Sequence, residues 1–185
     1  MKRHTSLLLL SSYFAVLLGC GPSSNGPSSA YGGRGSLQIG DPAPALSIGD
    51  WFQGDAVEKI ESGRVYVIEF WATWCGPCLM NMPHMSDLQE RYKNEVTFIG
   101  VTDESAEKVK AFLATESTSG APWSSEIKYR LGTDLNEAMY INYMAAANQM
   151  GIPTAFIIGK GGNIDWIGHP ADLDAPLAEA VQTGN

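Results

Sequence analysis

The sequence predicts a single α/β domain with a mostly parallel core, because β-prone and amphipathic segments alternate along it. Residues 65–70 form a nearly continuous apolar run of the kind that is buried in a parallel sheet. Residues 79–92 follow with apolar side chains at helical spacing, and residues 96–101 are a second buried strand. The 185 residues are 44% hydrophobic and 17% charged, which is enough apolar chain for one well-buried core.

The remaining elements continue this alternation to the end of the chain. We expect strands at residues 45–51, 128–131, 154–158 and 164–167, and helices at residues 104–114, 135–147 and 173–181. The Gly-containing turn at residues 160–163 makes the last two strands a hairpin. A Ser, Gly and Pro-rich break at residues 117–123 ends the first of these helices.

The motif Trp-Cys-Gly-Pro-Cys at residues 74–78 lies where a strand ends and a helix begins. At a helix N-terminus the macrodipole favours negative charge, so Cys75 ionises below the usual thiol pKa of about 8.5. Cys78, one turn further on, lies close enough to attack a mixed disulfide at Cys75. Pro77 suits the first helical turn, and Gly76 lets a partner chain approach. The spacing predicts a redox-active dithiol that needs no cofactor beyond its own disulfide.

Two separated motifs resemble those of thioredoxin-like proteins. Residues 70–78 are similar to their active-site segment, and Pro83 matches the proline that kinks their active-site helix. Residues 151–154 resemble the cis-proline loop of these proteins, which packs beside the dithiol and offers backbone to an extended substrate. The wording of both motifs is most similar to that of TlpA-like and ResA-like membrane-tethered thiol-disulfide oxidoreductases, close to the redoxin branch.

The resemblance covers residues 41–181 and implies a thioredoxin-like fold. We therefore expect a central mixed sheet flanked by helices, with an N-terminal strand extension and a central insertion between residues 103 and 150. It also implies roles for individual residues. The catalytic set would be Cys75, Cys78, Glu69 and Pro153, and the substrate contacts would come from Trp74, Gly76, Pro77, Ile152 and Thr154.

Glu69 is the one acidic residue in the apolar run of residues 65–70. Thioredoxins place a buried acid at this strand position and use it to move the proton of the second cysteine. A carboxylate in an apolar strand is costly unless it has a partner or a function. The alternative is that Glu69 faces solvent at a sheet edge.

Three functions fit the dithiol. The first is disulfide reduction, because the Gly-Pro pair resembles that of reducing thioredoxins. The second is a redoxin-type thiol peroxidase, although Ile68 and Ala72 stand where that signature has proline and threonine. The third is a dithiol metal-binding lipoprotein, but no metal is expected because only His84 and His169 would supplement the two thiols.

Residues 1–19 read as a signal peptide, with a basic start and an apolar core too short to span a bilayer. The run Leu-Leu-Gly-Cys ending at Cys20 resembles the bacterial lipobox, which implies lipid attachment to Cys20. Gly21 follows in place of the aspartate associated with inner-membrane retention, which favours the outer membrane. Residues 20–40 then form a flexible Gly, Ser and Pro-rich tether, so we expect the folded domain at residues 41–185.

The formal net charge of −8 disfavours nucleic acid as a partner. The leader and lipobox predict a protein of the bacterial cell envelope that faces the periplasm. We expect its partners to be periplasmic protein disulfides or thiols and a membrane-linked electron donor, with the lipid anchor in the membrane.

Overall fold

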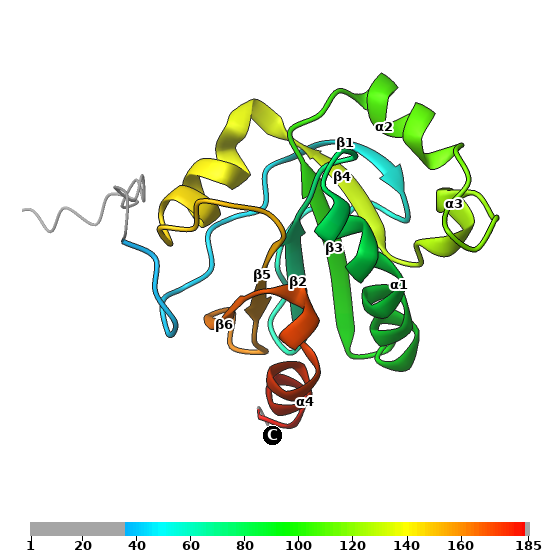
Figure 1. Ribbon diagram of the computed structural model, residues 1–185. Helices are drawn as coiled ribbons and strands as arrows, with labels where there is room; N and C mark the ends of the chain where they lie inside the picture. Colours follow the sequence, from blue (N-terminus) through cyan, green and yellow to red (C-terminus); the bar gives the residue numbers. More distant parts are fainter. Residues whose placement is uncertain (1–35, 184–185) are drawn as a thin grey trace, which may run out of the picture.

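The computed structural model describes residues 36–183 and holds a six-stranded mixed sheet of strand order β1-β4-β3-β2-β5-β6 (Figure 1). The strands are β1 (Ile48–Gln53), β2 (Val65–Phe70), β3 (Val96–Thr102), β4 (Arg130–Asp134), β5 (Thr154–Ile158) and β6 (Ile164–Gly168). Strand β3 pairs in parallel with β2 and β4, whereas the pairs β1–β4, β2–β5 and β5–β6 are antiparallel. The expected mixed sheet is confirmed, but a mostly parallel arrangement holds only for the three central strands.

The regular helices are α1 (Gly76–Arg91), α2 (Ala106–Leu113), α3 (Trp123–Glu126) and α4 (Asp174–Gln182). Two 3₁₀ turns, η1 (Leu135–Glu137) and η3 (Pro170–Asp172), and one π-helix, η2 (Tyr140–Ala145), complete the described residues. The prediction of one continuous helix over residues 135–147 is wrong. Asn136 and Glu137 have φ values of 55° and 59°, in the left-handed region, and this interrupts the helix. The carboxylate of Asp134 then accepts hydrogen bonds from the N–H groups of Met139 and Tyr140, both at 2.8 Å.

The sheet has a hydrophobic core on each face. The first core lies on the face that helices α1 to α4 cover. It contains Val65 and Val67, which alternate along β2, and also Phe98 and Ile157 of the neighbouring strands. The second core lies on the other face, which packs against the π-helix. It includes Tyr66, Ile68, Phe70, Ile99, Tyr143 and Phe156. All six residues of β2 are buried, which explains why its sequence does not alternate between apolar and polar.

The folded part begins before residue 41, the expected domain boundary. Leu37 is buried in the second core, and its N–H donates to the carbonyl of Ala146 at 2.9 Å. Gly40 donates to the carbonyl of Ile164 at 2.7 Å. Residues 36–40 therefore pack on the domain instead of belonging to a tether. The expected signal peptide, Cys20 and the rest of the tether lie outside the described residues, and within residues 36–183 no helix is long and apolar enough to cross a membrane.

Helix α1 is fixed to the sheet by both apolar and polar contacts. Met82, Met85 and Leu88 are fully buried on its inner face, so these methionines serve packing. The buried amide of Gln89 donates to the carbonyl of Val96 and accepts from the N–H of Phe98. These bonds satisfy the start of β3, because β4 pairs with β3 only from Ile99 onward.

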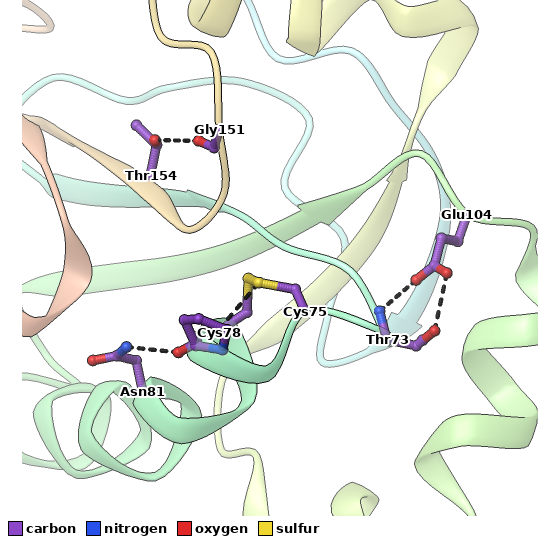
Figure 2. The surroundings of a disulfide bond; sticks show 8 residues. Thr73, Cys75, Cys78, Asn81, Glu104, Gly151 and Thr154 are labelled. Atoms are coloured by element: carbon purple, nitrogen blue, oxygen red, sulfur yellow. Dashed lines mark hydrogen bonds between the residues drawn. A yellow bond between two sulfur atoms is a disulfide. The ribbon is translucent and has the colours of Figure 1, made fainter.

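A buried carboxylate holds the segment that precedes the dithiol. Glu104, two residues after the end of β3, accepts hydrogen bonds from the N–H of Thr73 at 2.6 Å and from its hydroxyl at 2.9 Å, as Figure 2 shows. The same carboxylate pairs with Lys108 on α2. Burial raises the pKa of Glu104, but the hydrogen bonds from Lys108 and Thr73 and the charge of Lys108 outweigh it, so the pKa lies below the ordinary value of 4.5.

The stability that Glu104 contributes is expected to depend on pH. A depressed pKa in the folded protein adds stability above the unfolded pKa near 4.5, and this stability is lost as the pH falls through the folded pKa. We expect Glu104→Gln to lower the free energy of unfolding by about 2 kcal/mol at pH 7, where charged hydrogen bonds are lost. At pH 3 the difference from wild type should shrink. Urea unfolding at the two pH values measures both effects.

Glu107→Gln is the matched control, because Glu107 is exposed on the first turn of α2. It should change stability by less than about 0.5 kcal/mol. Equal destabilisation by the two substitutions would show that Glu104 does not hold this segment.

Candidate functional site

Cys75 and Cys78 lie at the N-terminus of α1 and form a disulfide with a Cα–Cα distance of 5.2 Å. Cys75 is the N-cap residue of α1, and its sulfur accepts the N–H of Cys78 at 3.2 Å. Pro77 stands in the first turn, where its missing N–H costs no helical bond. The predicted position of the dithiol at a helix start is therefore confirmed. Unpaired N–H groups at such a position stabilise a thiolate.

The two sulfurs differ in access to solvent. Cys75 retains 4% of its exposure and Cys78 retains none. Around them Trp74 is 70% exposed, and Gly76 and Pro77 are also exposed. A Cβ built on Gly76 would meet no atom within 4 Å, so this side of the motif is open. The three residues that were expected to contact substrate therefore form a surface around the less buried sulfur.

The loop before β5 lies opposite the disulfide in Figure 2. The peptide bond between Ile152 and Pro153 is cis, as the resemblance to the cis-proline loop implies. Ile152 is partly exposed and lines a groove together with Trp74. Thr154 is different from the expectation, because its side chain is buried and its hydroxyl donates to the carbonyl of Gly151 at 2.7 Å. Its side chain therefore shapes the loop and is not presented to a substrate.

Glu69 is 1% exposed and lies in the middle of the sheet. It pairs with Gly100 of β3 on one side and Ala155 of β5 on the other, so the alternative of a solvent-facing acid at a sheet edge is wrong. Burial raises the pKa of Glu69 from 4.5 to about 8. By strand alternation its side chain points to the face that α1 covers, which is the face that holds Cys78.

Two further polar groups accompany Glu69 inside the first core. Trp71 and Tyr129 are both buried, and neither the indole N–H nor the phenol hydroxyl has a hydrogen-bond partner among the described residues. Tyr129 could not be predicted from the sequence, because it lies far along the chain in the central insertion and has no local signal. Trp71 belongs to the motif but reads from sequence as ordinary core.

A groove of about 420 Å³ opens beside the dithiol. Its walls are mostly apolar and come from the end of β2, the cis-proline loop and the π-helix; they include Phe70, Trp74, Tyr140, Met144, Met150 and Ile152. Met150 is 76% exposed at the rim. The groove was not predicted from the sequence. The π-helix that forms one of its walls was expected to be an ordinary helix, and no role was assigned to it.

The histidines lie away from this arrangement. His84 Nε2 is 2.9 Å from the carboxylate of Asp174, which links α1 to α4. His169 Nδ1 accepts the N–H of Ala171 and caps η3. Within residues 36–183 no three His, Cys, Asp or Glu side chains gather where they could hold a metal ion.

Comparisons with known proteins agree with this geometry. The chain is similar to protein FixW of Rhizobium leguminosarum, at 29% identity over 79% of this chain and 67% of FixW. It is also similar to the thiol-disulfide oxidoreductase ResA of Bacillus anthracis, at 28% identity over 72% of this chain and 71% of ResA. The crystal structure of a thiol:disulfide interchange protein of Chlorobium tepidum, a thioredoxin family protein, superposes with a TM-score of 0.57. That match has 24% identity and covers 78% of this chain and 98% of the other, so it shows the shared fold.

Residues 39–167, well over half of the chain, match the family model described as the AhpC/TSA family. With its six-stranded mixed sheet and its dithiol at the start of α1, the protein belongs to the AhpC/TSA family and has a thioredoxin-like fold.

Proposed function

We propose that this protein reduces disulfide bonds of protein clients outside the cytoplasm through Cys75 and Cys78. The chain is a thiol-disulfide oxidoreductase of thioredoxin-like fold, and relatives such as ResA carry that activity in their names. The observation that carries the proposal is the hydrogen bond from the N–H of Cys78 to the sulfur of Cys75 at the start of α1. This contact places the attacking sulfur where negative charge is stabilised.

The reaction passes two electrons to the client. The Cys75 thiolate attacks one sulfur of the client disulfide, forming a mixed disulfide and releasing the other client sulfur as a thiolate. Cys78 then loses its proton and attacks the sulfur of Cys75. The Cys75–Cys78 bond forms, the bond from Cys75 to the client breaks, and the second client sulfur leaves. A dithiol donor linked to the membrane would return two electrons to the Cys75–Cys78 pair.

We assign Glu69 to the proton of Cys78. A carboxyl group with a pKa of about 8 is mostly protonated at pH 7 and half-ionised at about pH 8, so it can both release and accept a proton close to neutral pH. Its side chain lies on the same face of the sheet as Cys78, inside the first core, where water has little access. Ionised Glu69 would accept the proton as Cys78 attacks, and the step should therefore accelerate as the pH rises through about 8.

We assign the groove to the client segment next to the reacting disulfide. The backbone around Pro153 would meet an extended client chain, and an apolar client side chain would enter between Trp74 and Met150. Exposed apolar side chains of this size contribute binding energy when a partner covers them. Binding to the groove would hold the client sulfur beside Cys75.

Disulfides fit the site better than peroxides. The positions that carry proline and threonine in the peroxidatic signature are Ile68 and Ala72, and both are buried apolar residues here. Ala72 has no hydroxyl to offer a peroxide beside Cys75. Peroxide consumption at a rate comparable with disulfide reduction would favour the redoxin-type alternative.

We place the domain in the bacterial cell envelope, held by lipid on Cys20. The support is the leader at residues 1–19 and the lipobox-like run before Cys20. Gly21 favours the outer membrane over the inner membrane. A tether of Gly, Pro and Ser residues would let the dithiol reach clients near that membrane.

Cys78→Ser should accumulate a covalent adduct with a client. Without the second thiol the mixed disulfide at Cys75 is not resolved, so an insulin chain should remain bound in near-stoichiometric amount. Mass spectrometry before and after treatment with dithiothreitol measures the adduct. Cys75→Ser is the matched variant and should form none, and adduct formation of equal extent in both variants would contradict the assigned order of attack.

Met150→Ala should weaken client binding without affecting the chemistry. Loss of an apolar wall is expected to raise the KM for insulin by about fivefold, roughly 1 kcal/mol, and to leave reduction of a small aromatic disulfide unchanged. Met80→Ala is the matched control, because Met80 is 75% exposed on α1 and does not line the groove. Equal effects of the two substitutions on the KM would remove the groove from client binding.

Cys20→Ser should release the protein from the membrane. When the wild-type gene is expressed in a bacterial host, the protein should partition into the detergent phase of a Triton X-114 extract. The variant should move to the aqueous phase because it lacks the acyl chains. Equal partition of both proteins would contradict lipid attachment at Cys20.

A further inference from the structure

Four buried polar atoms on one face of the sheet have no hydrogen-bond partner among residues 36–183. They are both carboxylate oxygens of Glu69, Nε1 of Trp71 and the hydroxyl oxygen of Tyr129. Each of these residues is almost completely buried, and Trp71 and Tyr129 belong to the core on the α1 face of the sheet. Polar groups in such positions nearly always have partners, because each unsatisfied group carries a desolvation cost.

Gly100 brings the three side chains to one place. It lies directly opposite Glu69 in the parallel register of β2 and β3. A Cβ built on Gly100 would be 3.1 Å from Nε1 of Trp71 and 3.2 Å from Cε2 of Tyr129. The indole N–H and the phenol ring therefore border the space above Gly100, and the neighbouring position on β2 is that of the Glu69 side chain. The same Cβ would lie 2.7 Å from Cδ2 of Leu131, so the absence of a side chain at Gly100 is what lets these side chains close over the strand next to Glu69.

The chemistry of the three groups is complementary. Indole N–H is a donor only, the phenol hydroxyl donates one hydrogen bond, and a carboxylate accepts several. Burial raises the pKa of Tyr129, and the charge of Glu69 raises it further, so the hydroxyl keeps its proton and remains a donor. The effect of the Glu69 charge on the pKa of Tyr129 is consistent with the short distances around Gly100.

We propose that Tyr129 and Trp71 are positioning residues that hold the Glu69 carboxylate for proton exchange with Cys78. No direct bond joins these groups among residues 36–183, so the hydroxyl and the N–H would donate to the carboxylate after a small rotation of the side chains or through a bridging water. The inference rests on the proposed role of Glu69 and adds the groups that make this role compatible with an apolar core. In the resolving step the proton moves from the sulfur of Cys78 to an oxygen of Glu69, while the two donors stabilise the carboxylate that must be present beforehand.

Within residues 36–183, burial accounts for the raised pKa of Glu69, and the charge of Glu69 acts on Tyr129. From α1 the facing titratable group is Cys78, and from the segment before β4 it is Tyr129. Helices α2 and α4 contribute apolar residues such as Val109 and Leu177, and β5 contributes Ala155. A change in the titration of Glu69 after substitution of Tyr129 can therefore be assigned to the lost hydroxyl.

Tyr129→Phe tests the proposal, with Tyr143→Phe as the matched control. Both substitutions remove one hydroxyl from a buried tyrosine, but Tyr143 lies on the opposite face of the sheet and donates to the carbonyl of Pro44 at 2.6 Å. Carbon-13 NMR of the Glu69 carboxyl in the oxidised protein follows its titration without requiring activity. Burial alone raises the pKa of Glu69 to about 8, so with its donors in place the wild-type midpoint should lie below that value, and it should rise by about one unit in Tyr129→Phe because a donor to the charged form is lost.

The control should leave the midpoint of Glu69 within about 0.3 units of wild type. If Tyr129→Phe folds poorly, 3-fluorotyrosine at position 129 provides a stronger donor of nearly the same shape and should lower the midpoint. An unchanged midpoint in both altered proteins, or an equal shift in Tyr143→Phe, overturns the proposal. Its failure is distinct from failure of the proposed function, which is shown by wild-type protein that does not reduce insulin, whatever the titration of Glu69.

Discussion

The position of the α1 N-terminus at the end of β2 is the constraint on which the rest of the site depends. The sulfur of Cys75 accepts a hydrogen bond from the N–H of Cys78, which would otherwise have no partner in the first turn of α1. Packing of Met82 and Leu88 sets where this turn lies, and the bonds of Glu104 to Thr73 set where the preceding segment runs. The position of one sulfur thus depends on contacts from α1, from α2 and from the segments that follow β2 and β3.

The parts of the site that the sequence predicts are those encoded by neighbouring residues. The spacing of Cys75 and Cys78 after a strand is sufficient to place both at a helix start. Glu69 could be predicted to be buried because the residues around it are apolar on both faces, which is typical of a central strand. Pro153 was found only through the resemblance to a known loop, since a cis peptide bond has no general signature in sequence.

The parts that escaped prediction depend on tertiary contacts. Asn136 and Glu137 are left-handed although neither is glycine, and the carboxylate of Asp134 caps the chain just after them. A periodic apolar pattern therefore appeared as one helix where the structure has a 3₁₀ turn and a π-helix. π-Helices are rare and often occur at functional sites, and this one forms a wall of the groove. The burial of Leu37 could not be predicted for the same reason. It depends on a contact with Ala146, which is distant in the sequence.

The unequal burial of the two sulfurs has a consequence for the order of events in a catalytic cycle. Cys78 is fully buried, so a partner in thiol-disulfide exchange reaches the pair through Cys75. In the proposed reaction the client and the electron donor would therefore use the same sulfur. Because both partners would react at Cys75, they could not occupy the site at the same time. The proposed reaction would then follow ping-pong kinetics, with a high concentration of either partner inhibiting the half-reaction of the other. Reduction by the donor and oxidation by the client would both begin at the sulfur of Cys75.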